Sequence, residues 1–140
     1  MRAGATVLVD TGPFVAVFDP SDRDHAACTA ELGRLSRCRL VTTLAVLTEA
    51  SHLLAFSPDA QRSVIDFAGA GAVEVPEFGA ADLVRASALM TKYEDLPMDF
   101  ADATLVVLAE RLETPWVFTL DRQDFSVYRL GRRALRILPE

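Results

Sequence analysis

MDFADATLVVLAERL, residues 98–112, carries apolar side chains around almost the whole circumference of a helix. This pattern is typical of a helix that protein covers on most sides, and Pro97 just before it suits a first helical turn. Asp99 and Asp102 are three residues apart, so they project from the same face. The free N–H groups of a first turn accommodate Asp99. Asp102 lies among apolar neighbours, where an unpaired carboxylate is costly, so we expect it to have a partner such as a divalent cation.

Short apolar strands alternate with helical patterns along the rest of the chain. The sequence predicts strands at 6–9, 39–42, 72–75, 116–120 and 135–138. It predicts a turn at TGPF (11–14) and helices from Ser21 or Asp22 to about Arg37, and over about 44–56, 58 to 69 or 71, 78–93 and 98–112. Within these helices, Leu53 and Leu83 are expected to face the core. Such alternation favours an α/β fold, with a parallel sheet covered by helices on both faces.

The size and composition are those of an ordinary globular protein. With 140 residues, 51% of them hydrophobic and 24% charged, the chain is interpreted as a single domain over 1–140. No apolar run reaches the roughly 20 residues that a membrane span needs, and the N-terminal run stops at Asp10. We therefore expect a cytoplasmic protein without a signal peptide. Cys28 and Cys38 are ten residues apart without further ligand spacing, which argues against a zinc site or a disulfide.

The net charge of −6 would at first argue against a protein that handles nucleic acid. If five of the twenty acids form one site, however, fifteen remain against fourteen basic residues, and the rest of the surface is nearly neutral. The C-terminal part is rich in arginine and has a single acid, Asp124, between residues 122 and 136. These arginines form either a patch that follows RNA phosphates or a solvated edge, and both interpretations stay open for Arg122, Arg129, Arg132 and Arg133.

Acidic residues recur where an α/β sheet places its functional crevice. Asp10 and Asp121 each follow a predicted strand, and the carboxyl ends of parallel strands meet at one edge. Asp99 and Asp102, in the first turn of a helix, lie within reach, and Glu49 lies among the apolar residues of the helix after the second strand. Converging carboxylates repel one another and raise one another's pKa values. Mg²⁺ or Mn²⁺, which prefer oxygen ligands, would resolve that conflict.

Four segments together resemble the PIN-domain nucleases, and more closely the VapC-type ribonuclease toxins of toxin–antitoxin pairs. They are LVDTGPFVA (8–16), LTEASHLL (47–54), MDFADATLVVLAE (98–110) and FTLDRQDF (118–125). The resemblance implies a three-layer α/β/α fold with a short, mostly parallel central sheet. It also implies an acidic quartet, formed by Asp10, Glu49, Asp102 and Asp121. Asp99 matches an additional acid, and Thr11 and Thr119 match two hydroxyls that support the site. Whether Asp124 contributes stays open.

The resemblance also implies an activity and partners. We expect hydrolysis of RNA phosphodiesters with Mg²⁺ or Mn²⁺, leaving a 5′-phosphate. Asp10 and Asp102 would hold the principal metal, Asp121 and Asp99 would bind through water or hold a second metal, and Glu49 would orient or deprotonate the attacking water. A VapB-like antitoxin would fill the acidic groove with a basic C-terminal segment and would carry any DNA binding. A homodimer is expected, through the helices between residues 58 and 93.

Other enzyme classes fit less well. A haloacid-dehalogenase-like phosphatase with Asp10 as nucleophile needs a second aspartate two residues later, where this chain has Gly12. A response-regulator receiver needs adjacent acids near the first strand and a late lysine, and neither is present. DTGPF does not supply the GxGxxG of a dinucleotide-binding domain. A PIN-like module that only binds a partner stays open as the non-enzymatic alternative.

Overall fold

A four-stranded parallel sheet lies at the centre of the computed structural model, which describes residues 1–140. The strands are β1 (Thr6–Val9), β2 (Arg39–Val41), β3 (Trp116–Phe118) and β6 (Arg136–Leu138), in the order β2-β1-β3-β6. All three strand pairs are parallel, and Val9 stands opposite Phe118 at the carboxyl end of the central pair. The predicted parallel sheet is confirmed.

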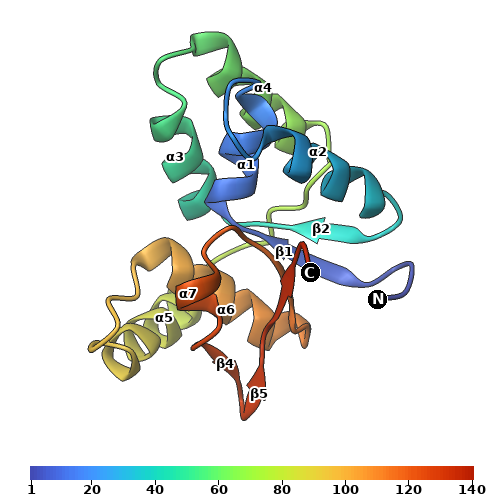
Figure 1. Cartoon of the computed structure of the whole chain (residues 1–140). Helices are drawn as coiled ribbons and strands as arrows, with labels where there is room; N and C mark the ends of the chain where they lie inside the picture. Colours follow the sequence, from blue (N-terminus) through green and yellow to red (C-terminus); the bar gives the residue numbers. More distant parts are fainter.

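Seven helices surround this sheet (Figure 1). They are α1 (Thr11–Phe18), α2 (His25–Arg34), α3 (Leu44–Leu53), α4 (Pro58–Gly69), α5 (Ala80–Lys92), α6 (Phe100–Leu112) and α7 (Arg122–Phe125). Helices α1, α2 and α4 pack together over one face of the sheet, where their side chains meet those of β1, β2 and β3. Helix α6 covers the other face with α5 outside it, while α3 contacts both α1 and α6. The predicted three-layer α/β/α arrangement is confirmed.

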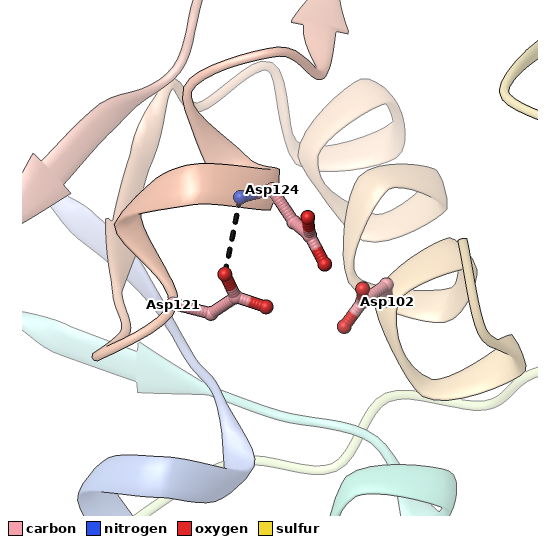
Figure 2. A group of neighbouring side chains, drawn as sticks. All are labelled: Asp102, Asp121 and Asp124. Carbon is pink, nitrogen blue, oxygen red and sulfur yellow. Dashed lines mark hydrogen bonds between the residues drawn. The ribbon is translucent and has the colours of Figure 1, made fainter. Parts of the chain in front are cut away.

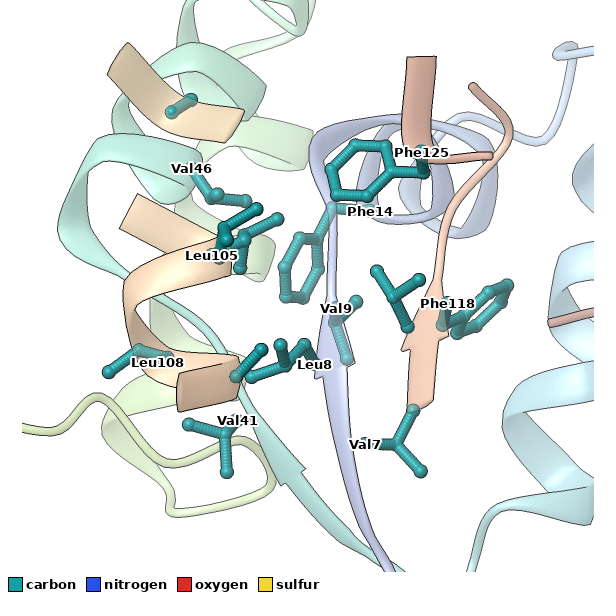
Figure 3. Packing of buried hydrophobic residues seen from close by; sticks show 14 of the residues in the cluster. Val7, Leu8, Val9, Phe14, Val41, Val46, Leu105, Leu108, Phe118 and Phe125 are labelled. Carbon is teal, nitrogen blue, oxygen red and sulfur yellow. The ribbon is translucent and has the colours of Figure 1, made fainter. Parts of the chain in front are cut away.

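Helix α6 is the most deeply buried element, as its all-round apolar pattern predicts. Every residue from 101 to 109 is buried. Figure 3 shows Leu8 of β1 directed toward Leu105 and Leu108 of α6, while Phe118 of β3 points to the opposite side. Because successive side chains of a strand point to opposite faces, each short strand contributes to both layers of the core. None of the helices has the length and hydrophobicity needed to cross a bilayer.

One predicted turn and two predicted helix starts differ from the structure. The predicted turn at residues 11–14 is the first turn of α1, where Pro13 is tolerated because the first N–H groups of a helix have no intrahelical partner. Helix α2 begins at His25, not at residue 21 or 22, because Asp19 and Asp22 accept hydrogen bonds from backbone N–H groups two residues later and form turns. Pro97 lies outside α6, which begins at Phe100.

Several strand and burial predictions also need correction. Residues 72–75 form no strand, and only Glu74 makes an isolated parallel bridge, to Val41. Strand β3 ends at Phe118 rather than at residue 120. Leu53 and Leu83 do not face the core, because they are 52% and 49% exposed. Helix α7 and the antiparallel hairpin of β4 (Arg129–Leu130) and β5 (Arg133–Ala134) were not predicted.

Candidate metal centre and active site

A cleft of about 490 Å³ opens at the carboxyl ends of β1 and β3. In the strand order, β2 lies next to β1 on one edge and β3 lies next to β1 on the other. The order therefore reverses at β1, and the cleft lies at this topological switch point. No lysine, arginine or histidine lines the cleft, and none of its acids forms an ion pair. Its wall contains six carboxylates, those of Asp10, Glu49, Asp99, Asp102, Asp121 and Asp124.

Asp10 is held by a threonine from the neighbouring strand. It follows β1 directly and is 7% exposed. The buried Thr119 hydroxyl donates a hydrogen bond to Asp10 Oδ2 at 2.7 Å and accepts one from the Asp121 N–H at 3.0 Å. One side chain therefore fixes the positions of two acids. Burial raises the pKa of Asp10 to about 6, against the opposing effect of the Thr119 hydrogen bond.

Asp102 lies in the first turn of α6 and is 8% exposed. Its N–H donates to Asp99 Oδ1 at 2.8 Å, so Asp99 is the N-cap of the helix. The hydroxyl of the buried Tyr128 donates to Asp102 Oδ2 at 2.8 Å. Burial raises the pKa of Asp102 to about 8; the Tyr128 hydrogen bond opposes this rise, and the charges of Asp10 and Asp99 add to it. Nothing cationic in the chain compensates this carboxylate.

Asp102, Asp121 and Asp124 bring one oxygen each to within 4.8 Å of one another. Figure 2 shows the Asp124 carboxylate directed toward Asp102, with Asp121 beside them. Asp121 caps α7 by accepting a hydrogen bond from the Asp124 N–H through Oδ1 at 3.0 Å, which leaves its second oxygen for the cleft. Burial and the Asp121 charge raise the pKa of Asp124. Three oxygens at this spacing suit a hard divalent cation.

Glu49 reaches the cleft from α3. Thr43 caps this helix by accepting a hydrogen bond from the Val46 N–H, and its hydroxyl also shares a 2.9 Å hydrogen bond with the Thr104 hydroxyl of α6. The helices that carry Glu49 and Asp102 are therefore joined directly. Burial and the Asp99 charge raise the pKa of Glu49.

Two small features complete the cleft wall. The Thr11 hydroxyl is buried beside the Glu49 carboxylate, where it lowers the pKa of that group against the effect of burial. A Cβ atom at Gly12 would lie 3.3 Å from Leu120, so glycine lets α1 approach the loop that carries Asp121. The uncompensated carboxylates of this cleft are the ligand type that a hard divalent cation prefers.

The five acids predicted from the sequence all line this one cleft, together with Asp124. Thr11 lines it as well, and Thr119 lies behind Asp10. The four arginines do not line it. Arg122 donates to the carbonyl of Pro139, Arg129 donates to three carbonyls at the end of α7, and Arg132 and Arg133 are exposed around the β4–β5 turn. Their contact with RNA stays a prediction.

Sequence reasoning missed Tyr128. A buried tyrosine hydroxyl needs a hydrogen-bond partner, and the run DFSVY after Asp121 is apolar enough to be buried. No spacing rule connects residue 128 to an acid on another helix, however. The hydrogen bond between Thr43 and Thr104 was not predicted, for the same reason.

Comparisons with known proteins agree with this architecture. The family model for the PIN domain matches residues 7–130. Ribonuclease VapC26 of Mycobacterium tuberculosis is 36% identical over 136 residues, which cover 95% of this chain and 100% of that protein. The chain therefore belongs to the PIN-domain family, and within it to the VapC ribonucleases.

Solved structures show the same fold. VapC20 of M. tuberculosis, described as a sarcin–ricin loop cleaving toxin, superposes with a TM-score of 0.77 at 17% identity, covering 89% of this chain and 97% of that one. VapBC2 of Rickettsia felis, bound to a DNA fragment from its promoter, gives 0.69 at 17% identity, covering 94% and 98%.

Proposed function

We propose that this chain is a Mg²⁺- or Mn²⁺-dependent endoribonuclease whose active site is the acidic cleft. The observation that carries the proposal is the gathering of six carboxylates around one cleft without a single basic side chain. A folded protein tolerates such a cluster at neutral pH when a cation binds there, because the carboxylates otherwise repel one another and take up protons. The membership in the VapC ribonucleases supports RNA as the substrate.

The residues have distinct proposed roles. Asp102, Asp121 and Asp124, which have oxygens within 4.8 Å of one another, would hold the cation. This set differs from the pair of Asp10 and Asp102 expected from the sequence. Asp10 and Asp99 would complete the negative wall. A bound Mg²⁺ or Mn²⁺ would supply charge neutralisation and would lower the pKa of a coordinated water. Glu49 would accept the proton of the attacking water, and its raised pKa suits that task. Water would add to phosphorus as the bond to the 3′-oxygen breaks, and that oxygen would take up a proton, which leaves a 3′-hydroxyl and a 5′-phosphate.

The partners that we propose follow from the relatives. One structural relative is a VapBC complex, and we propose that a VapB-like antitoxin inhibits this chain by placing a basic side chain in the acidic cleft. Any contact with DNA would be made by the antitoxin.

We also propose a homodimer through α4 and α5, supported by apolar side chains that these helices expose, namely Ile65, Leu83 and Val84. Light scattering should then give twice the chain mass for the wild type and the single mass for Val84→Glu.

Cleavage of RNA by the purified chain tests the activity. We expect 5′-phosphorylated products with Mn²⁺ and none with EDTA, as measured by sequencing the 5′ ends. Asp102→Asn and Asp10→Asn should each lower the rate at least about 100-fold, because even changes behind a metal ligand typically cost 10- to 100-fold. Asp66→Asn, which removes an exposed acid of α4, is the matched control and should cleave like the wild type. Full activity of Asp102→Asn, or Mn²⁺ binding by the wild type without cleavage, would contradict the proposal.

A further inference from the structure

Tyr128 connects the two segments that supply the candidate metal ligands. It follows α7, three residues after Phe125, and is completely buried. Its hydroxyl donates to Asp102 Oδ2 on α6 at 2.8 Å. This bond therefore ties the segment that carries Asp121 and Asp124 to the helix that carries Asp102.

The Tyr128 ring is fixed from two sides. The rings of Phe125 and Tyr93 each pack edge-on against it, with centroids 5.1 Å away. A ring clamped in this way presents its hydroxyl at a defined point, so it restrains the carboxylate that accepts its hydrogen bond.

The hydrogen bond ties the cleft carboxylate of Asp102 to a fixed donor. Its Oδ2 accepts from the Tyr128 hydroxyl, and one of its carboxylate oxygens lies within 4.8 Å of oxygens of Asp121 and Asp124. We propose that Tyr128 is a positioning residue of the metal centre, which holds Asp102 in the orientation that cation binding requires. This inference rests on the proposed metal-dependent function.

Tyr93 supplies a matched control. Tyr93→Phe and Tyr128→Phe each remove one hydroxyl and one hydrogen bond from the same aromatic cluster, but only Tyr128 contacts an acid of the cleft. If Tyr128 served only to pack the aromatic cluster or to form one buried hydrogen bond, the two variants would behave alike. A positioning role would make only Tyr128→Phe defective in metal binding.

Calorimetric titration of metal-free protein with Mn²⁺ separates these cases without relying on activity. We expect Tyr128→Phe to bind Mn²⁺ about 10-fold more weakly than the wild type, and Tyr93→Phe to bind within about twofold of it. Thermal unfolding in EDTA should show that both variants remain folded. Equal Mn²⁺ affinity of Tyr128→Phe and the wild type, or an equal loss in both variants, would overturn the inference.

RNA cleavage at increasing Mn²⁺ gives a second readout. Tyr128→Phe should approach the wild-type rate at high Mn²⁺, because its ligands are all present, whereas Asp102→Asn should not recover. Failure of Tyr128→Phe to recover would contradict a positioning role. If the wild type itself binds no Mn²⁺, the proposed function fails. If the wild type binds and Asp102→Asn does not, while Tyr128→Phe matches the wild type, only the role of Tyr128 fails.

Discussion

Asp102 and Asp10 are carboxyl groups that the metal-free protein buries without a cation. Their pKa values in the folded protein, about 8 and about 6, lie above the value of about 3.9 expected for an unfolded aspartate. The folded state therefore binds more protons than the unfolded state between about pH 4 and pH 8. Because stability rises with pH only where the unfolded state binds more protons, the metal-free protein should lose stability as pH rises through this window.

The first prediction at the residue scale concerns this pH dependence. In EDTA, the melting temperature of the wild type should fall between about pH 5 and pH 8. Asp102→Asn should show a shallower fall and be the more stable protein at pH 8, by more than about 1 kcal/mol, because an amide carries no charge to bury. Calorimetry across this pH range checks it. A wild type that becomes more stable with rising pH would contradict the assignment.

The second residue-scale prediction concerns Thr119, whose hydroxyl holds Asp10 and the Asp121 backbone. Thr119→Val should lower the free energy of unfolding by about 1–3 kcal/mol, because it leaves a buried carboxylate oxygen without a donor. It should also slow RNA cleavage. Thr91→Val removes an exposed hydroxyl bond within α5 and is the control, with little effect on either quantity. Urea unfolding and cleavage rates measure both, and equal behaviour of the two variants would refute the role of Thr119.

The positions of the acids were predictable, and the groups that orient them were not. Asp10 and Asp121 follow strands whose carboxyl ends share one edge, so topology alone brings them together. Asp99 and Asp102 follow from helix periodicity in the same way. Tyr128 and Thr104 act across elements that are distant in sequence, and their partners depend on tertiary packing, which no local pattern contains.

At the scale of elements, the contact between α3 and α6 joins the two helices that carry Glu49 and Asp102. The shared hydrogen bond of Thr43 and Thr104 is buried, and Thr43 also caps α3. Ser57 caps α4 in the same manner, through the Ala60 N–H, but lies away from the cleft. The two caps are therefore a natural pair for separating stability from catalysis.

Substitution of these caps gives the third prediction. Thr43→Val and Ser57→Ala should each lower the free energy of unfolding by about 1 kcal/mol, the usual contribution of an N-cap. Only Thr43→Val should also slow cleavage, because it loosens α3 against α6. Denaturant titration and cleavage rates under saturating Mn²⁺ provide the comparison. If Ser57→Ala lost as much activity as Thr43→Val, the hydrogen bond between α3 and α6 would have no specific role in catalysis.

Long elements were easier to predict than short ones. Helix α6 was recognised because thirteen residues repeat one apolar pattern, whereas α7 has four residues and β4 and β5 have two each. Elements of that size have too few residues to show a period. Helix α1 was missed because Gly12 and Pro13 are typical turn residues, although a first helical turn also accepts proline.

At the scale of the whole molecule, cation binding should be coupled to folding. A ligand that binds only the folded state stabilises it by about 2.7 kcal/mol at one hundred times its dissociation constant. The fourth prediction is that Mn²⁺ raises the melting temperature of the wild type and that EDTA reverses the rise. Asp102→Asn should not respond. An equal response of both proteins would locate the bound ion elsewhere.

The most direct test of the central claim is an anomalous difference map from crystals of this chain grown with Mn²⁺. We expect a manganese peak in the cleft, in direct contact with carboxylate oxygens of Asp102 and at least one of Asp121 and Asp124. A well-ordered cleft without a peak, or a peak only at surface acids outside it, would contradict a metal centre formed by these residues.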